Sequence, residues 1–433
     1  MKFRPHPAPC RLVAALALAA GPAAALAQTT VSGNVQLYGT LNPMIDRVVV
    51  DHASASAPAV RPSMLSAAAY SGNGNGGVTR MQGSTSNFGI RGSESLGGGL
   101  SAIFQLESRV SFDEPGAAPA TNSLFNRNSR VGLAGGFGTV FAGSWDTPNA
   151  WSHLATTNGV RNPYAGDSSD IFLTPGFNIP HSVTVDGRGN NPADANFNRR
   201  QGNSLQYWSP NWSGFSFRVA YSGNSGEKSA ANGAKYTPTV RGLGAEYASG
   251  GLMLRYVYQQ QDDYFGLAWI GPNPAANPDA AGSTATSSKD TNHRLIARYA
   301  VAPGWTVQGT FDRLTYGADG VAAGRVNRYS RDAYAALVVA RQGAHSAWAN
   351  IGLARDGDCA LSGSGACNTD ALGARMWGLG WRYDFSKRTD VFASVYRVTN
   401  RANGQYGVFP RSVAGIAPGS RQTGLTVGIE HSF

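Results

Sequence analysis

The sequence predicts an all-β fold, a 16-stranded antiparallel barrel that spans a membrane, with short periplasmic turns and long external loops. The chain ends on GLTVGIEHSF, in which Leu425, Val427, Ile429 and Phe433 form an apolar face opposite small and polar residues. Short turns alternate with long loops, and 55 of the 433 residues are Gly. After residue 27 no apolar run approaches the roughly 20 residues of a membrane-spanning helix. Strands with one apolar face are therefore the expected membrane-crossing elements.

Residues 1–27 have the composition of a secretory signal peptide. Lys2, Arg4 and Arg11 form a basic amino-terminal region, an apolar segment follows, and residues 25–27 form an A-x-A cleavage site. Cys10 precedes the apolar segment without the small-residue context of a lipoprotein signal, so we expect no lipid anchor. The mature chain is expected to be one barrel domain over residues 28–433.

Sixteen strands are expected in sequence order, joined by seven short turns at one end and longer loops at the other. An even strand number suits a single-chain outer-membrane barrel, and sixteen strands leave room for an aqueous channel. The expected strands are 31–46, 86–94, 100–110, 127–134, 139–145, 203–209, 215–221, 241–248, 252–261, 293–301, 305–315, 331–341, 345–354, 372–384, 389–398 and 424–433.

Alternation assigns the two faces of the clearest strands. In 100–110, every second residue from Leu100 to Leu106 is apolar and is expected to face lipid, which turns Glu107 and Arg109 to the lumen. The same argument turns Arg218, Arg255 and Arg298 inward from strands 215–221, 252–261 and 293–301. The sequence therefore predicts a polar, basic lumen.

The longest connection, residues 146–202, follows the fifth strand and is expected to narrow the lumen. It carries Asp167 and Asp170, which we expect to face three inward arginines of strands two to four. Arginine keeps its charge and lowers the barrier to anions in a narrow passage. Glu107 is expected to orient Arg109 rather than to act as a catalytic acid. The expected constriction residues are Arg91, Arg109, Arg130, Glu107, Asp167 and Asp170.

Cys359 and Cys367 are the cysteines that remain after removal of the signal peptide. They lie in a Gly/Ser-rich stretch between strands, and the signal peptide directs the chain to an oxidising compartment. We therefore expect a disulfide in one external loop. A metal site is not expected, because no nearby His or further Cys supplies the remaining ligands.

Five stretches resemble the general diffusion porins of β-proteobacterial outer membranes, and the resemblance covers essentially the whole mature chain. The matching stretches are VQLYGTLN (35–42), NFGIRGSESLGGGLSAIFQLES (87–108), FNRNSRVGLAGGFGTVFAG (125–143), NSLQYWSPNWSGFSFRVAYS (203–222) and the terminal VGIEHSF. The resemblance implies a homotrimer of sixteen-stranded barrels, each narrowed by its third external loop and passing small hydrophilic solutes. It also implies that the wall arginines are Arg91, Arg109 and Arg130.

The same resemblance assigns the end of the chain and reveals one departure. Val427, Ile429 and Phe433 resemble the signal read by the outer-membrane barrel insertion machinery. Many members of the family follow the glycine of the fifth strand with Arg-Gln, whereas Gly143 is followed here by Ser144 and Trp145. A wall charge is therefore missing at this point, and Trp145 is a candidate to alter the pore width.

These features predict a passive, anion-preferring pore in the outer membrane, without cofactor or catalytic residues. The expected partners are two further copies of the chain, outer-membrane lipid and lipopolysaccharide, the insertion machinery and small solutes; nucleic acid is not expected. A substrate-specific channel for an organic anion, phosphate or sugar remains an alternative. A barrel enzyme is less favoured, since the chain has no G-x-S-x-G, H-E-x-x-H, P-loop or C-x-x-C motif. A soluble binding protein would leave the apolar outer faces in water.

Overall fold

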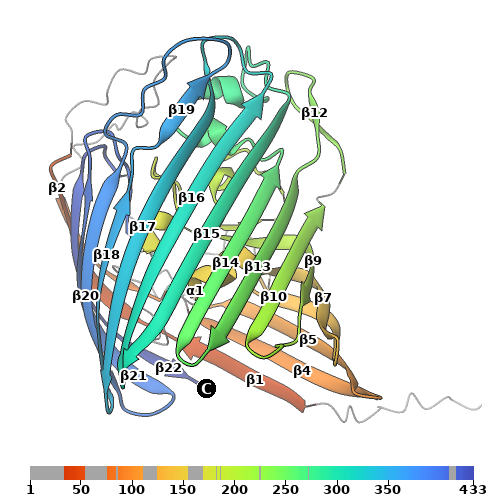
Figure 1. The fold of residues 1–433 in the computed structure, drawn as a ribbon, viewed down its shortest axis with the longest axis vertical. Coiled ribbons are helices and arrows are strands. Elements are labelled where there is room, and N and C mark those ends of the chain that lie inside the picture. Colours follow the sequence, from red (N-terminus) through yellow and green to blue (C-terminus); the bar gives the residue numbers. More distant parts are fainter. Residues whose placement is uncertain are drawn as a thin grey trace, which may run out of the picture.

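Segments with alternating apolar and polar side chains form strands that pair in sequence order and close into a barrel (Figure 1). The computed structural model describes residues 34–53, 76–83, 86–110, 124–154, 169–181, 183–185, 187–223, 226–271, 273–408 and 416–433. The barrel has sixteen antiparallel strands, as predicted. Closure joins the last strand to the first, with Met44 opposite Gly428 and Thr40 opposite Ser432.

Two of the sixteen barrel strands are each interrupted once. The first consists of β1 (Asn34–Leu41) and β2 (Met44–Asp51), and the second of β3 (Gly76–Gln82) and β4 (Asn87–Gly97). The other barrel strands are β5 (Leu100–Arg109), β6 (Ser129–Gly135), β7 (Gly138–Asp146), β9 (Arg199–Trp208), β10 (Phe215–Gly223), β13 (Thr239–Ser249), β14 (Leu252–Asp262), β15 (Ser287–Ala302), β16 (Trp305–Asp319), β17 (Val326–Gln342), β18 (His345–Ala354), β20 (Ala374–Asp384), β21 (Thr389–Asn400) and β22 (Arg421–Ser432).

Shorter elements lie in the long connections. The helices are α1 (Pro148–Leu154), α2 (Ser169–Phe172), η1 (Pro192–Ala195), η2 (Gly266–Trp269) and η3 (Pro274–Ala276), and the short strands are β8 (Val183–Val185), β11 (Lys228–Ser229), β12 (Lys235–Tyr236) and β19 (Asp358–Leu361). None of the described helices has the length and apolar character that a membrane span requires.

The first two predicted strands had wrong boundaries. Residues 31–46 were expected to form one strand, but β1 and β2 are separated at Asn42 and Pro43, because proline has no N–H to give to a ladder. Residues 31–33 lie outside the described part of the chain. The second strand was expected to begin at residue 86, whereas its pairing with β2 already starts at Gly76. The break at Pro43 lies beside the gap between β3 and β4, since β1 pairs with β4 and β2 pairs with β3. The first two barrel strands are therefore interrupted at the same height in the barrel.

The outer and inner faces follow the predicted alternation. On β22, Leu425, Val427 and Ile429 are exposed, whereas Thr426 and Glu430 point inward and are buried. Trp212, Trp305 and Phe385 are exposed near short turns, as expected of residues at a membrane interface. Gly97, Gly98 and Gly99 all have positive φ angles, which explains the glycine run in the tight β4–β5 turn. One apolar surface thus faces outward while polar side chains face the lumen.

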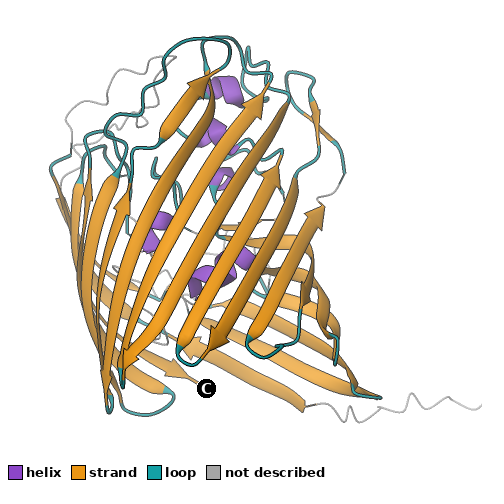
Figure 2. Ribbon diagram, in the orientation of Figure 1, coloured by secondary structure: helices purple, strands orange, loops and turns teal. Residues whose placement is uncertain are grey.

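The long connections fill part of the barrel interior (Figure 2). A first buried cluster joins residues of η1, η2 and neighbouring loop segments, such as Phe197, Phe265 and Leu267, to Leu314 and Tyr316 of β16. A second cluster joins the α2 segment to β17, β18, β20 and β21. Apolar packing inside the barrel therefore fixes the loops against the wall.

Candidate functional site

The connection between β7 and β9 folds into the barrel. Figure 2 shows its helices inside the barrel, surrounded by the strands. Helix α1 packs against β13 and β14, where glycines make room for it: a Cβ atom at Gly242 would lie 2.8 Å from Pro148, and one at Gly244 would lie 3.0 Å from Trp151. Gly242 and Gly244 of β13 thus leave the space in which helix α1, in the first half of the loop, packs against the wall.

Helix α2 docks on a different part of the wall, formed by β17, β18 and β20. Ile171 and Phe172 are fully buried, and a Cβ atom at Gly352 would lie 3.2 Å from the Ile171 side chain. Arg331 of β17 donates hydrogen bonds to the carbonyl oxygens of Ile171 (2.7 Å) and Phe172 (3.2 Å). These carbonyls end the helix and have no intrahelical partners, so a buried cation is a favourable neighbour.

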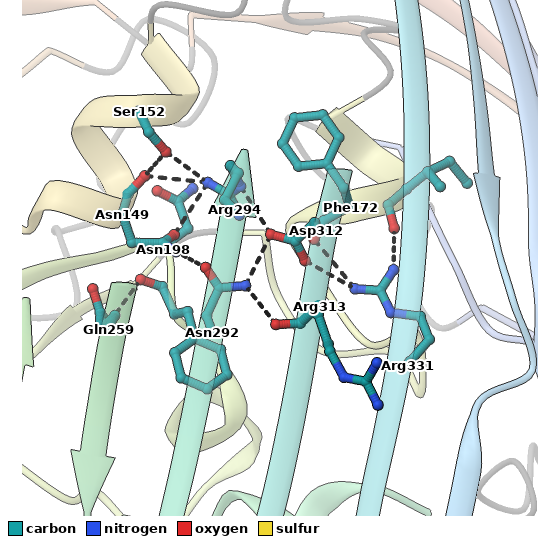
Figure 3. Close-up of polar contacts among 12 residues, drawn as sticks. Asn149, Ser152, Phe172, Asn198, Gln259, Asn292, Arg294, Asp312, Arg313 and Arg331 are labelled. Atoms are coloured by element: carbon teal, nitrogen blue, oxygen red, sulfur yellow. Dashed lines mark hydrogen bonds and ion pairs between the residues drawn. The ribbon is translucent and has the colours of Figure 1, made fainter. Parts of the chain in front are cut away.

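A buried charge network joins the two halves of the loop (Figure 3). Asp312 of β16 accepts a hydrogen bond from Arg294 Nε at 2.9 Å, and its other oxygen lies 3.6 Å from Arg331 Nη2. Arg294 also donates to Ser152 Oγ (2.9 Å) and to the carbonyl oxygen of Asn149 (3.2 Å) in α1. The side chains of Arg294, Asp312 and Arg331 are all 0% exposed. One carboxylate therefore lies between the two arginines that bind α1 and α2.

Arginines and tryptophans alternate along the wall beside α1. The guanidinium carbon of Arg218 lies 4.1 Å from the ring centroid of Trp208 and 4.1 Å from that of Trp151. Arg255 lies 3.7 Å from the Trp151 centroid, and Arg130 lies 4.8 Å from that of Trp208. We call this series, Arg130, Trp208, Arg218, Trp151 and Arg255, the Arg–Trp ladder. Each contact has cation–π geometry, which holds the guanidinium planes in place.

Arg130 has further aromatic neighbours. Its guanidinium carbon lies 4.7 Å from the centroid of Phe141 and 4.2 Å from that of Trp145, in addition to Trp208. Trp145 occupies the position after Ser144 at which the chain departs from the family pattern, and it is 8% exposed. In place of a further wall charge, this tryptophan supplies an aromatic face to Arg130.

The predicted constriction residues on β4 and β5 lie on the lumen face. Arg91 is exposed, donates to Gln36 Oε1 at 2.9 Å and lies 4.8 Å from the Tyr38 ring centroid. Arg109 is also exposed. Glu107 was expected to orient Arg109, but its carboxylate accepts hydrogen bonds from Arg127 Nε (2.6 Å) and Tyr38 OH (3.0 Å). Residues 107 and 109 are about 6.7 Å apart along the strand, whereas Arg127 approaches from the neighbouring segment.

The loop carboxylates do not form the expected acidic side of a constriction. Asp167 lies outside the described residues. Asp170 is 1% exposed, and its Oδ1 lies 3.5 Å from Nε2 of His181, another residue of the loop. Asp170 was therefore wrongly placed opposite Arg91, Arg109 and Arg130, because the apolar residues that follow it draw α2 against β17, β18 and β20 and bury the carboxylate there.

The lumen arginines predicted from alternation point inward as expected by register. Arg255 is opposite Glu246 and donates to it from Nε at 2.9 Å, with a second contact from Nη2. Arg218 and Arg298 are partly exposed. The inward carboxylate of Glu246 thus lies near the inward arginines Arg218, Arg255 and Arg298.

The two cysteines form the expected disulfide, and the carboxyl-terminal residue pairs with the first strand. Cys359 of β19 and Cys367 form a disulfide in the loop after β18, with their Cα atoms 5.6 Å apart. Phe433 exchanges backbone hydrogen bonds with Gly39 (3.1 and 3.2 Å), which ties the chain end to β1. Among the described residues, no group of three or more His, Cys, Asp or Glu side chains is arranged to hold a metal ion.

Several residues of the site were not identified as site residues in the sequence. Alternation in 305–315 and 331–341 places Asp312 and Arg331 on the inner face, but it gives no sign that the loop covers them. Trp151 and Trp208 carry no local motif either. Their roles follow from contacts between segments far apart in the chain, such as the 145 positions between Asn149 and Arg294.

Comparisons with known proteins agree with this fold. The family model described as Gram-negative porin matches residues 13–403. Outer membrane porin protein 32 of Delftia acidovorans is 26% identical, with 97% of this chain and 98% of that protein covered. Among solved structures, the anion-selective porin from Comamonas acidovorans has a TM-score of 0.63 at 20% identity over 93% of this chain and 100% of that one. The trimer form of OmpT from Vibrio cholerae has a TM-score of 0.55 at 13% identity, covering 93% and 99%.

Proposed function

This chain belongs to the Gram-negative porin family and is an outer-membrane porin, and on that premise we propose that it forms a water-filled, anion-preferring channel. Ions and small hydrophilic solutes cross it by passive diffusion. The proposal includes no enzymatic step and no cofactor. Residues 1–27 act as the export signal in this proposal, and residues 28–433 form the barrel.

The unequal exposure of inward charges supports the anion preference. The inward carboxylates Asp46, Asp290 and Asp312 are fully buried, and Glu430 is 5% exposed. By contrast, the inward arginines Arg91, Arg109, Arg130, Arg218, Arg298 and Arg341 retain exposure to the lumen. Among the described inward carboxylates, Glu246 and Asp384 keep partial exposure, and each pairs with an arginine. A passing ion therefore experiences a net positive wall.

The loop of residues 146–202 narrows this channel in our proposal. Its helix α1 adds Trp151 to the basic wall, and the adjacent strands supply Arg130 and Arg218. Arg91 and Arg109 extend the basic surface over β4 and β5. Glu107 neutralises Arg127 and leaves the other guanidinium groups available to anions.

Assembly follows the structural neighbours in our proposal. The OmpT structure from Vibrio cholerae that this barrel resembles is a trimer form, and we propose a homotrimer for this chain as well. We propose further that the exposed residues Val427, Ile429 and Phe433 of the last strand are recognised during insertion into the outer membrane.

The Arg–Trp ladder favours a second candidate, a channel specific for organic anions. Indole faces attract planar apolar groups while guanidinium edges bind carboxylates. A solute with both features, such as benzoate, would bind transiently along the ladder. The current carried by this solute would then reach a maximum as its concentration is raised, at concentrations where the chloride current still increases.

Two measurements test these proposals. Swelling of liposomes that contain the purified protein should be rapid in small neutral sugars and slow progressively with sugar size, as general diffusion requires. An absence of swelling with correctly folded protein would contradict the channel. Planar-bilayer currents in benzoate and chloride then separate the candidates: parallel, linear increases support the general channel, and saturation in benzoate alone supports the specific one.

A further inference from the structure

Four arginines lie close together on the outside of the barrel, towards the end with the long connections. We call Arg47 of β2, Arg375 of β20, Arg397 of β21 and Arg421 of β22 the outer-wall arginine cluster. Arg47 is opposite Leu425, Arg375 is opposite Leu353, and Arg397 is opposite Trp377. These three partners are exposed on the outer surface, so the arginines share the lipid-facing side rather than the lumen side.

The strand register brings the four positions together. Arg375 and Arg421 are both opposite Thr399, which is two residues from Arg397. With strands about 4.8 Å apart and side chains on one face about 6.7 Å apart, Arg397 is about 8 Å from each of them at the Cα level. Arg47 lies two strands away from Arg397 and is displaced by two residues along the strand, which gives a Cα distance of about 12 Å. Arginine side chains are long enough to converge on one group over such distances.

The cluster borders the apolar band of the wall. Farther along the same strands, towards the short turns, the outer face carries exposed apolar residues, including Ile45, Leu379 and Leu425. Arg397 also lies 5.9 Å from the Trp377 ring centroid, and tryptophan is typical of the level where hydrocarbon meets headgroups. The guanidinium groups thus lie where a lipid headgroup begins.

The charges of the cluster are only partly neutralised by the protein. Arg421 forms an ion pair with Asp51 at 2.8 Å, but Arg47, Arg375 and Arg397 have no ion pair with a described carboxylate. Arg47 and Arg397 donate instead to Thr79 and Thr423 hydroxyls, at 3.1 and 3.0 Å. Elsewhere on the outer wall, Arg241 and Arg313 pair with Asp262 and Asp332. The cluster is therefore a site with unused positive charge.

We propose that the outer-wall arginine cluster binds the phosphate groups of a phosphorylated glycolipid in the outer leaflet. Guanidinium groups form bidentate hydrogen bonds with phosphate, and the low dielectric of the adjacent hydrocarbon strengthens the attraction. The acyl chains of the same lipid would cover the exposed leucines beside the cluster. This inference rests on the outer-membrane location and is independent of ion selectivity.

The test is native mass spectrometry of the detergent-solubilised protein with bisphosphorylated lipid A and with the same lipid after removal of its phosphates. Wild-type protein should retain the phosphorylated form selectively. Arg375→Gln/Arg397→Gln should weaken that binding about tenfold or more. The matched control, Arg241→Gln/Arg313→Gln, changes two outer-wall arginines that already have carboxylate partners and should stay within about twofold of wild type.

Three results would overturn the proposal. The first is equal lipid binding by the cluster variant and wild type. The second is displacement of the lipid by millimolar inorganic phosphate, which would indicate a site for a free anion. The third is a change in oligomeric state with unchanged lipid binding, which would assign the cluster to a contact between copies of the chain. Single-channel conductance should be the same in all variants, so failure of the lipid proposal remains separate from failure of the channel.

Discussion

The contacts of Arg218 show how one charged side chain is held in position in this lumen. Its guanidinium lies between the indoles of Trp151 and Trp208, at 4.1 Å from each ring centroid. Aromatic faces attract the cation without neutralising its net charge, unlike a carboxylate partner. The side chain is therefore held in position while its field still reaches the lumen. Arg294 is the opposite case, since Asp312 neutralises it and the loop covers it.

At the same scale, Trp208→Leu should lower the preference for anions. The substitution removes the aromatic face shared by Arg130 and Arg218, so both guanidinium groups gain freedom to turn away from the permeation path. The chloride-to-potassium permeability ratio should fall, and Trp208→Phe should restore most of it. Trp212→Leu, an exposed tryptophan near a short turn, is the control and should leave the ratio unchanged. An unaltered ratio in Trp208→Leu would show that the ladder has no part in selectivity.

Asp312→Asn should destabilise the protein strongly. It leaves Arg294 and Arg331 buried without their carboxylate, and breaking a buried ion pair costs about 3–5 kcal/mol. Asp332→Asn removes the partly exposed partner of Arg313 and should cost less than about 1 kcal/mol. Urea unfolding followed by tryptophan fluorescence compares the two free energies. Equal losses would mean that the buried network does not hold the loop.

The element that depends most on tertiary contacts is the inserted loop. The strands follow from alternation, as in 215–221 and 252–261, because each turns one apolar face to lipid whatever its neighbours are. Asp170 illustrates the limit, since its position depends on the packing of Ile171 and Phe172 against β17, β18 and β20. Pro43 is the opposite case, because a proline is itself a local sign of the strand break found between β1 and β2.

The loop should also respond to acid through His181. Burial lowers the pKa of this histidine to about 4, despite the nearby Asp170 carboxylate and hydrogen bonds to the backbone of Asp170 and Gly407. The folded state therefore binds the proton less readily than the unfolded state, whose pKa is near 6.5. The stabilising contribution is complete above about pH 6.5 and is lost as the pH falls towards 4.

Limited proteolysis of the loop between pH 4 and 7 measures this effect. Cleavage within residues 146–202 should increase as the pH falls in wild-type protein. His181→Asn cannot take up the proton and should show a flatter dependence. Identical pH profiles for the two proteins would exclude His181 as the cause.

For the whole molecule, the decisive feature is the distribution of charge between surfaces. Most inward carboxylates are buried. Six inward arginines keep partial or full exposure, others such as Arg294 and Arg331 are buried, and a further set of arginines lies outside the wall. The arginines of the barrel thus lie on two separate surfaces, and alternation along single strands was used to predict only the set that faces the lumen. Which inward charges are covered was beyond prediction, because covering depends on the path of the long loop.

The reversal potential across a potassium chloride gradient in a planar bilayer tests the central claim most directly. Wild-type protein should give a chloride-favouring potential, and Arg218→Ala or Arg130→Ala should shift it towards zero, because each removes a positive charge from the lumen wall. Arg313→Ala, on the outer surface, should leave the potential unchanged. A cation-favouring potential in the wild type would contradict the proposal that accessible arginines and buried carboxylates set the selectivity of this pore.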